Sequence, residues 1–200
     1  AVLLDREARS TPSLNDPNFG RVREPILRLA NWMRAFNARS ASGNFLLGIS
    51  DDATTSIGQS VLRSPSVFNF YRPGYIPPNT GLAEAGLVAP EMQIIHETSV
   101  VGYSNYMRGA VQLGVGPGTP REIRPDYTAE IALADQPNAL VDRLDLLLCA
   151  GTMSSTTKNL IRNAVASIRV PTINPTSAHN NRVWLAVLMT LSAPDYLVQK

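Results

Sequence analysis

The residues best placed for chemistry are a histidine and two hydroxyl side chains at helical spacing. His96, Ser99 and Tyr103 follow one another at about one turn, and on a helix over 90–113 they lie on its apolar face, whereas Glu97 points away. A buried imidazole in that position can act as a general base or hold a ligand. The alternative is a core histidine whose nitrogens bond to a tyrosine hydroxyl or to a backbone carbonyl.

A second candidate is the proline-rich stretch 64–90. Its five prolines lack a backbone donor and fix φ, so the stretch predicts a long loop and not a helix or central strand. Its aromatic side chains are Phe68, Phe70, Tyr71 and Tyr75. Together with Arg72 they could form a stacking surface for a sugar or a peptide, with Arg72 binding a carboxylate. Alternatively, the rings plug a gap between helices and Arg72 anchors the loop by hydrogen bonds to carbonyls.

Other kinds of chemical site find little support in the sequence. Two histidines, His96 and His179, are too few for a His-rich metal site, and neither C-x-x-C nor H-E-x-x-H occurs. The run G-V-G-P-G-T-P follows no predicted strand and lacks the G-K-[ST] ending, so a flexible connection is favoured over a phosphate-binding loop. Cys149 lies in an apolar run, which predicts a buried, inert thiol. We therefore expect no metal and no cofactor.

The elements that would position these side chains are helices. Residues 1–9 have the pattern of a helix end, and apolar side chains recur at helical spacing further on. The predicted helices cover 21–38, 52–62, 90–113, 137–150, 154–170 and a last segment from about 182 to 193. No stretch alternates apolar and polar residues for more than a few positions, so no sheet is expected. The prediction is a single all-α domain over 1–200, an irregular multi-helix array with the loop 64–90 packed across it.

Charge and hydropathy narrow the choice of partner. The formal net charge is +2, and the 16 arginines, against two lysines, are scattered and not clustered. This weak excess does not predict nucleic-acid binding. No apolar run approaches the roughly 20 residues that span a bilayer, so no membrane span is expected. The chain also starts without methionine inside an apparently helical segment, so we expect it to be part of a longer protein.

Several phrases, in order along the chain, resemble one bacterial family. They are A-V-L-L-D-R-E-A-R, G-R-V-R-E-P-I-L-R-L, S-P-S-V-F-N-F-Y-R-P-G-Y, L-V-A-P-E-M-Q-I, L-L-L-C-A-G-T-M-S and S-A-P-D-Y-L-V-Q-K. Their order and spacing resemble the C-terminal part of the family known as domain of unknown function 1800. One departure is Arg6, where the family often has proline. The family is usually more than twice this length, so the resemblance implies that an N-terminal portion lies outside this chain.

The resemblance implies a mainly helical protein that is exported to the periplasm or cell surface. Family members are commonly encoded beside a second, sulfatase-like exported family, and no catalytic residues are established that could be carried over. Two functions follow as hypotheses. One is a non-catalytic interaction or structural module that acts with a co-encoded exported protein or a cell-surface polysaccharide. The other is a hydrolase for an ester, lactone or glycan, with its site between the 64–90 loop and His96 and with Arg72, Tyr75, Tyr71 and Tyr103 as binding candidates.

Overall fold

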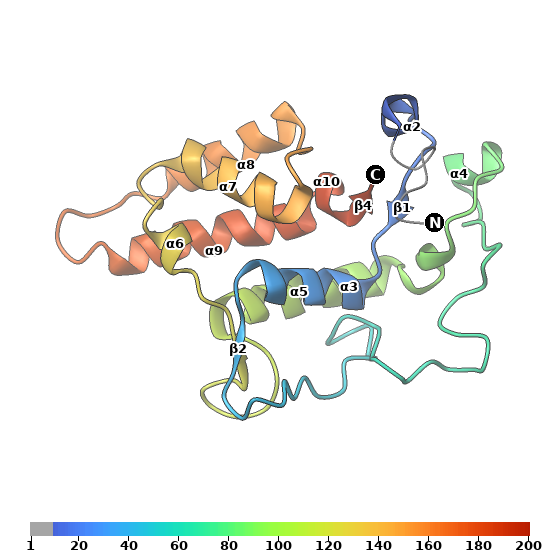
Figure 1. The fold of residues 1–200 in the computed structure, drawn as a ribbon, viewed down its shortest axis with the longest axis horizontal. Coiled ribbons are helices and arrows are strands. Elements are labelled where there is room, and N and C mark those ends of the chain that lie inside the picture. The colour runs from blue at the N-terminus through green and yellow to red at the C-terminus, as the bar shows by residue number, and fades with distance from the viewer. Residues whose placement is uncertain (1–9) are drawn as a thin grey trace.

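The fold of this chain is known from a computed structural model that describes residues 10–200, and it is mainly α-helical, as the sequence predicts (Figure 1). The expected helix end at 1–9 lies outside the described residues. The longer helices are α3 (Pro25–Ala35), α5 (Glu97–Leu113), α7 (Pro137–Cys149), α8 (Ser155–Ser167) and α9 (Thr176–Ser192). The shorter ones are α2 (Thr11–Asn15), α4 (Gly81–Glu84), the 3-10 helix η2 (Pro90–Ile94), α6 (Thr128–Ile131) and α10 (Pro194–Leu197).

α7, α8 and α9 form one packed layer, and α7 and α8 are confirmed close to their predicted bounds. α7 begins with Pro137, and α8 begins after Ser154, whose hydroxyl accepts a hydrogen bond from the backbone N–H of Thr157 at 3.2 Å. α7 and α8 both contact α9, and α5 contacts α9 from below in Figure 1. α9 begins at Thr176, several residues earlier than predicted. The prediction missed this start because the first turn is polar and shows no helical pattern of apolar residues.

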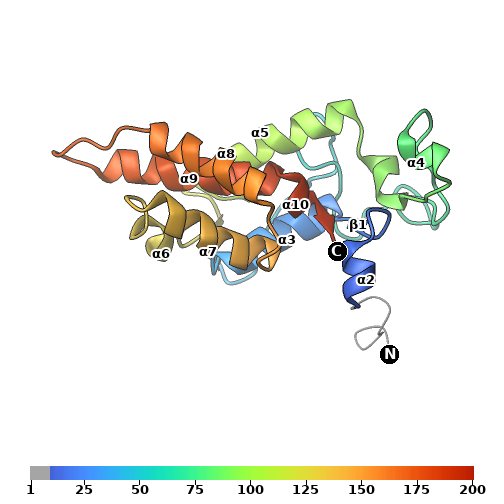
Figure 2. The same cartoon turned by 90° about the horizontal axis from the view of Figure 1, so that it is seen from above.

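The core lies between this layer and the pair α3 and α5. Figure 2 shows α3 beside α7 on one side of α9, with α5 on the other. A buried hydrogen bond fixes this junction, because the indole N–H of Trp32 donates to the hydroxyl of Tyr127 at 2.9 Å. The largest fully buried side chains include Trp32, Tyr196, Phe36, Leu29, Ile57, Met107, Ile123, Leu140, Leu144, Ile161 and Leu191.

Two short antiparallel ribbons tie distant parts of the chain together. β1 (Arg21–Val22) pairs with β4 (Val198–Gln199), and β2 (Arg39–Ser40) pairs with β3 (Ile123–Arg124). The sequence predicts no sheet, because two residues are too few to show an alternating pattern. The first ribbon also shortens the predicted helix 21–38: α3 starts only at Pro25, where the proline ring suits a first helical turn.

The predicted helix over 90–113 is interrupted in the structure. η2 ends at Ile94, Ile95 and His96 have extended backbone, and α5 begins at Glu97. Ser99 holds the break, because its hydroxyl accepts from the backbone N–H of His96 and donates to the carbonyl of His96, both at 2.9 Å. The prediction that His96 lies on a buried helix face is therefore wrong: His96 is the N-cap residue and is exposed.

The segment 41–80 runs as an extended strap below α3 and α5 (Figure 1). The predicted helix over 52–62 does not form. Asp52 instead accepts hydrogen bonds from the backbone N–H and hydroxyl of Thr54, and Gly58 has a φ of +73°, a conformation outside the helical region. The expectation that the 64–90 loop packs across the array fails for its first part, because Val67 is 94% and Phe68 is 79% exposed.

Candidate functional site

Tyr71 is the loop residue that reaches the helical array. It lies beside a network in which Arg21 Nε donates to Glu91 Oε1 at 2.6 Å and Gln59 Nε2 donates to Glu24 Oε2 at 2.7 Å. Burial, with an added contribution from the Glu24 carboxylate, raises the pKa of Tyr71 to about 12. The network joins β1, the N-terminus of α3, the strap and η2, which is the arrangement expected of an anchor.

Arg72 and Tyr75 join this anchor through their backbone. The N–H of Arg72 donates to Oε1 of Gln93 at 2.8 Å, while the Arg72 side chain is exposed. The carbonyl of Tyr75 accepts from the N–H of Ala89 at 2.9 Å. The loop is therefore held by main-chain bonds, and the Arg72 guanidinium does not bond to carbonyls of residues 10–200.

His96 and Tyr103 have different surroundings. His96 is exposed at the start of α5, whereas Tyr103 is buried two turns further on and donates its hydroxyl to the carbonyl of Leu191 at 3.2 Å. Burial raises the pKa of Tyr103 to about 12, and the guanidinium of Arg28 lies 5.1 Å from its ring centre. The structure thus brings Tyr103 together with a buried arginine, and it places His96 in solvent.

A hollow with the volume of a small-molecule site lies at the C-terminal end of α5, the opposite end from His96. We call it the Arg39–Trp184 hollow, and its volume of about 730 Å³ falls in the range of small-molecule sites. Its walls come from β2, β3, the last turn of α5, the segment that leads into α6, and α9. The polar and aromatic side chains that line it are Arg39, Ser40, Gln112, Glu122, Arg124, Asp126, Tyr127, Thr128, Asn180 and Trp184.

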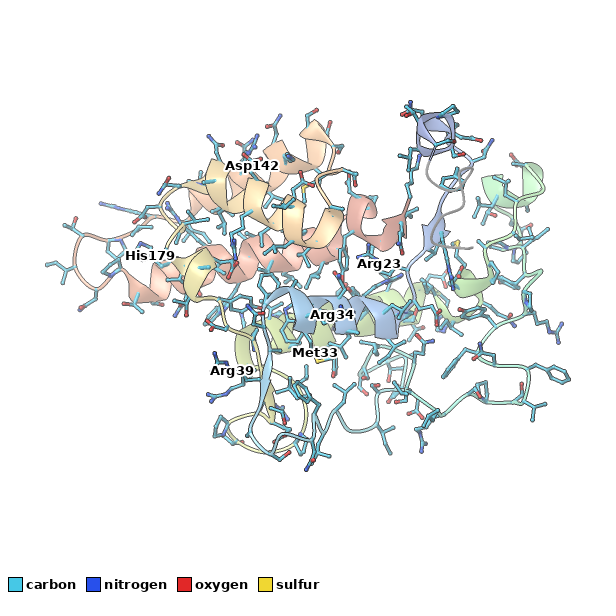
Figure 3. All side chains as sticks on the ribbon, viewed as in Figure 1. Arg23, Met33, Arg34, Arg39, Asp142 and His179 are labelled. Carbon is cyan, nitrogen blue, oxygen red and sulfur yellow. The ribbon has the colours of Figure 1, made fainter. Side chains whose placement is uncertain are left out.

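The register of one ribbon places two arginines side by side in this hollow. Arg39 of β2 is the direct cross-strand partner of Arg124 of β3, and both side chains are exposed (Figure 3 labels Arg39). Directly opposed residues share one face and have Cβ atoms about 5 Å apart, so like charges there destabilise the ribbon. Neither guanidinium forms an ion pair within 4 Å to a carboxylate of residues 10–200.

Two carboxylates, those of Glu122 and Asp126, lie two residues before and after Arg124 and also line the hollow. Glu122 Oε1 accepts hydrogen bonds from the hydroxyls of Ser40 and Ser42, and Asp126 Oδ1 accepts from the hydroxyl of Thr128 at 2.6 Å. These hydrogen bonds, from side chains first and backbone second, hold the pKa of both carboxyl groups below their ordinary values. The hollow therefore combines two guanidinium groups with two firmly ionised acceptors.

The far wall of the hollow is aromatic and amidic. Trp184 and Asn180 come from α9, and Gln112 comes from the end of α5. Trp184 and Gln112 also line a smaller adjoining hollow of about 170 Å³ that extends to Arg108. An indole between two hollows offers a flat apolar surface, and the amides supply both donors and acceptors.

Sequence reasoning did not find this hollow. Arg39 and Arg124 stand far apart in the chain, and each alone is one of 16 scattered arginines. The only local signal was the series Glu122, Arg124 and Asp126. These charged residues are two positions apart, so in an extended segment their side chains lie on the same face. That signal becomes meaningful only once β2 is known to pair with β3.

A histidine–aspartate contact exists elsewhere, at the start of α9. His179 Nε2 lies 3.0 Å from Oδ2 of Asp135, and Arg182 donates to the carbonyls of Ala134 and Ile168 (Figure 3 labels His179). No serine, threonine or cysteine of residues 10–200 forms a hydrogen bond with the His179 imidazole. Within the same residues, no group of three or more His, Cys, Asp or Glu side chains is placed to hold a metal ion, and no helix is long and apolar enough to cross a membrane.

Comparison with known proteins gives a family but no characterised relative. The chain has no match among curated proteins and none among solved structures. The family model described as "Protein of unknown function (DUF1800)" matches residues 1–198 of the 200-residue chain. The match covers nearly the whole sequence and agrees with the phrases noted above, so this chain belongs to the DUF1800 family.

Proposed function

We propose that this chain is a non-catalytic module that binds an acidic polysaccharide in the Arg39–Trp184 hollow. The observation that carries the proposal is the cross-strand pairing of Arg39 with Arg124. A directly opposed pair of arginines weakens the ribbon that holds it, and an anionic group bound between them relieves the repulsion. Planar guanidinium groups match the two oxygens of a carboxylate or sulfate.

The other groups in the hollow favour a hydroxyl-rich ligand. Glu122 and Asp126 are acceptors that lie two residues to either side of Arg124, and Gln112 and Asn180 add amides. A ligand that alternates acidic groups with hydroxyls can use both the arginines and these acceptors. The nucleic-acid backbone carries one phosphate and at most one free hydroxyl per nucleotide, so it offers the two carboxylates few donors and is disfavoured. Trp184 adds a flat surface of the kind that packs on the apolar face of a sugar ring.

The electrostatics of the hollow support binding over hydrolysis. A glycosidase needs one carboxyl group whose pKa is raised, so that it can donate a proton to the leaving oxygen. Both carboxyl groups of the hollow have lowered pKa values, because hydroxyl and amide donors stabilise their charged forms. Neither group is therefore suited to act as a general acid at neutral pH.

Titration calorimetry with galacturonic acid oligosaccharides tests the proposal, with neutral maltodextrins of equal length as the reference ligand. We expect the acidic ligand to bind and the neutral one to bind at least about tenfold more weakly. Arg39→Gln and Arg124→Gln should each weaken binding by about tenfold or more. The matched control is Arg169→Gln, an exposed arginine that does not line the hollow, and it should bind as the unaltered protein does.

Arg39→Gln and Arg124→Gln should also differ from the unaltered protein in stability when no ligand is present. Removing either member of the arginine pair should raise the free energy of unfolding by about 0.2–1 kcal/mol, since the like-charge repulsion is lost. A variant that binds less and unfolds more easily would point to damage to the fold instead. Unchanged binding by both variants would overturn the proposal.

The alternative suggested by the sequence is a hydrolase that uses His96. It is tested by assaying model esters, lactones and polysaccharides with the unaltered protein and with His96→Ala. Release of acid or of reducing ends by the unaltered protein, abolished in the variant, would replace the binding-module proposal with this one. His96 is exposed, and its side chain faces the backbone N–H of Ser99 in a capping box. No carboxylate of residues 10–200 lies within ion-pair distance of the His96 imidazole to activate it.

We further propose that the protein acts in the periplasm or at the cell surface, where acidic polysaccharides occur, and that a co-encoded exported protein is a partner. Both ideas rest on the family resemblance. Fractionation of cells that express the full-length gene, followed by detection of the protein, tests the location. Recovery only from the cytoplasm would contradict it.

A further inference from the structure

A second cavity, unrelated to the Arg39–Trp184 hollow, lies where α3, α5 and α10 meet. It has a volume of about 170 Å³. Its walls are mostly hydrocarbon, from Ile57 of the strap, Met92 and Ile95 at η2, Val100 of α5 and Leu197 of α10. A cavity of about this size, lined by apolar side chains, has room for a ligand as large as benzene.

One wall of this cavity is a buried cation. Arg28 is only 5% exposed, and its Nε donates to the carbonyl of Arg23 at 2.7 Å. Its guanidinium lies 5.1 Å from the ring centre of Tyr103, which also lines the cavity. Among residues 10–200, Arg28 has no carboxylate partner within ion-pair distance. Burial lowers the pKa of Arg28, which reflects the cost of keeping this charge away from water.

A second arginine close to Arg28, Arg23, carries a charge of the same sign. Arg23, beside α10 in Figure 3, places its guanidinium 4.4 Å from the ring centre of Tyr196, and its Nη1 is buried with no hydrogen-bond partner in residues 10–200. The two arginines therefore rest on aromatic faces, and no carboxylate of residues 10–200 lies within ion-pair distance of either. A cation–π contact is worth about 1–2 kcal/mol, which is less than the several kcal/mol that desolvation of a charge costs.

The other polar groups around the cavity do not supply an anion. Tyr103 donates its hydroxyl to the carbonyl of Leu191, Ser99 bonds to the backbone of His96, and Ser104 donates to the carbonyl of Val100. Within the described part of the chain, none of the residues that line the cavity carries a carboxylate. The cavity thus combines an apolar interior with one uncompensated positive group in its wall.

We propose that this cavity binds a small monoanionic amphiphile, such as a short-chain or aromatic carboxylate. Its acidic group would lie against the guanidinium of Arg28, and its hydrocarbon part would lie among Ile57, Met92 and Ile95. The apolar tail removes hydrocarbon from water, and the carboxylate supplies the charge that Arg28 lacks. The cavity volume restricts the ligand to about the size of hexanoate or benzoate.

Thermal unfolding with matched acids and alcohols tests the proposal. Hexanoate and benzoate are compared with hexanol and benzyl alcohol, which have similar hydrocarbon parts and no charge. We expect the acids at saturation to raise Tm by about 3 °C or more, because they bind the folded state alone, and the alcohols to raise it by less. Arg28→Met, which keeps an unbranched stem of similar shape and removes the guanidinium charge, should abolish the preference for the acids.

Two neighbouring valines supply a matched pair of variants that do not alter Arg28. Val100 lines the cavity and is 53% exposed, whereas Val101 is 60% exposed and does not line it. Val100→Phe should narrow the cavity and remove the response to hexanoate, whereas Val101→Phe should keep it. Arg124→Ala should also keep it, which excludes binding in the Arg39–Trp184 hollow.

Three results would overturn the inference. Equal stabilisation by acids and alcohols would mean that Arg28 has no role in binding. No response to any of the four compounds would mean that the cavity takes no ligand of this class. A full response to hexanoate in Val100→Phe would place binding elsewhere. These readings stay available even if Arg28→Met fails to fold, because the valine pair leaves the buried arginine in place.

Discussion

At the scale of single residues, the hydroxyl of Tyr196 joins the C-terminal end of the chain to α3. This fully buried tyrosine donates to the carbonyl of Arg28 at 2.7 Å. Tyr196→Phe keeps the ring on which Arg23 rests and removes only this bond, so we expect the free energy of unfolding to fall by about 1–2 kcal/mol. Urea denaturation measures the change.

Tyr75 provides the comparison for Tyr196. It is half-buried, and its hydrogen bonds with the described residues run through its backbone. Tyr75→Phe should change the free energy of unfolding by no more than about 0.5 kcal/mol. An equal loss in the two variants would mean that the removal of any tyrosine hydroxyl, and not this hydrogen bond, accounts for the effect.

The thiol of Cys149 was predicted correctly from the sequence, whereas the position of His96 was not. Cys149 is free and buried, and burial, followed by the nearby Asp145 carboxylate, raises its pKa to about 12. Its apolar neighbours in the sequence are enough to predict this. His96 has apolar neighbours too, but it is exposed because the helix is broken at this point and Ser99 stabilises the break. A break of this kind cannot be predicted from helical periodicity.

At the scale of elements, two glycines of α5 have opposite roles. A Cβ at Gly102 would collide with the carbonyl oxygen of Ala53, where the strap passes over the helix, whereas a Cβ at Gly109 would meet no atom of residues 10–200 within 4 Å. Gly102→Ala should therefore lower the free energy of unfolding by about 2 kcal/mol or more. Gly109→Ala should raise it by about 0.5–1 kcal/mol, because alanine favours the helical backbone.

Thermal and urea unfolding of the two alanine variants, made in the same helix, measures this difference. Destabilisation by both variants would mean that α5 tolerates no added methyl group, and that the close contact with Ala53 is not the cause. Stabilisation by both would mean that the strap can move away from the helix.

Asp195, in the first turn of α10, links that helix to the start of α8. Its carboxylate accepts from the backbone N–H of Ser154 and from the hydroxyl of Thr157, each at 2.7 Å. Partial burial acts to raise the pKa of Asp195, but these hydrogen bonds outweigh it, so the pKa lies below the ordinary value of 3.8. The carboxylate therefore contributes stability above that pH, and the contribution is lost as pH falls through the lowered folded-state pKa.

Asp195→Asn should lower the free energy of unfolding by about 1 kcal/mol at pH 7, since an amide can accept only one of the two bonds and the site is partly screened by solvent. The difference from the unaltered protein should shrink as pH falls from about 5 to about 2. Urea titrations along this pH series measure it, with the exposed Glu84→Gln as the control. A difference that does not depend on pH would show that the charge of Asp195 is not what holds the two helices.

The sequence predicted the elements that show strong helical periodicity. α7 and α8, with regular apolar spacing and Pro137 or Ser154 at their starts, were placed within a few residues. The two ribbons, the early start of α9 and the break before α5 were missed. The ribbons depend on two-residue pairings, the start of α9 on a polar turn, and the break on one serine hydroxyl. None of these produces a periodic pattern of apolar residues in the sequence. The candidate hollow was missed for the same reason, because a tertiary pairing creates it.

At the scale of the whole molecule, the strap 41–80 leaves several apolar side chains in solvent. Val61, Leu62, Val67 and Phe68 are all more than 60% exposed. Apolar patches of this kind often mark interaction surfaces. Leu62→Ser combined with Phe68→Ser should leave the free energy of unfolding within about 0.5 kcal/mol, since neither side chain packs on the core.

The same double variant should bind less of a hydrophobic fluorescent dye such as ANS and should self-associate less at high protein concentration. Leu146→Ser combined with Ile173→Ser, at exposed positions outside the strap, is the matched control. A clear loss of stability in the strap variant would show that these side chains pack in solution. An equal fall in dye binding for both variants would show that the exposed apolar side chains of the strap bind the dye no better than those elsewhere on the surface.

The β1–β4 ribbon also determines how the domain would respond to a pulling force. Arg21 pairs with Gln199 and Val22 with Val198 in antiparallel register, so the chain segments before β1 and after β4 leave the ribbon at the same end. Tension between residues 20 and 200 would peel the pairs apart one after the other, beginning with Arg21 and Gln199, and would not load them together in shear. The ribbon would open at low force and release the C-terminal strand while the three-helix layer is still folded.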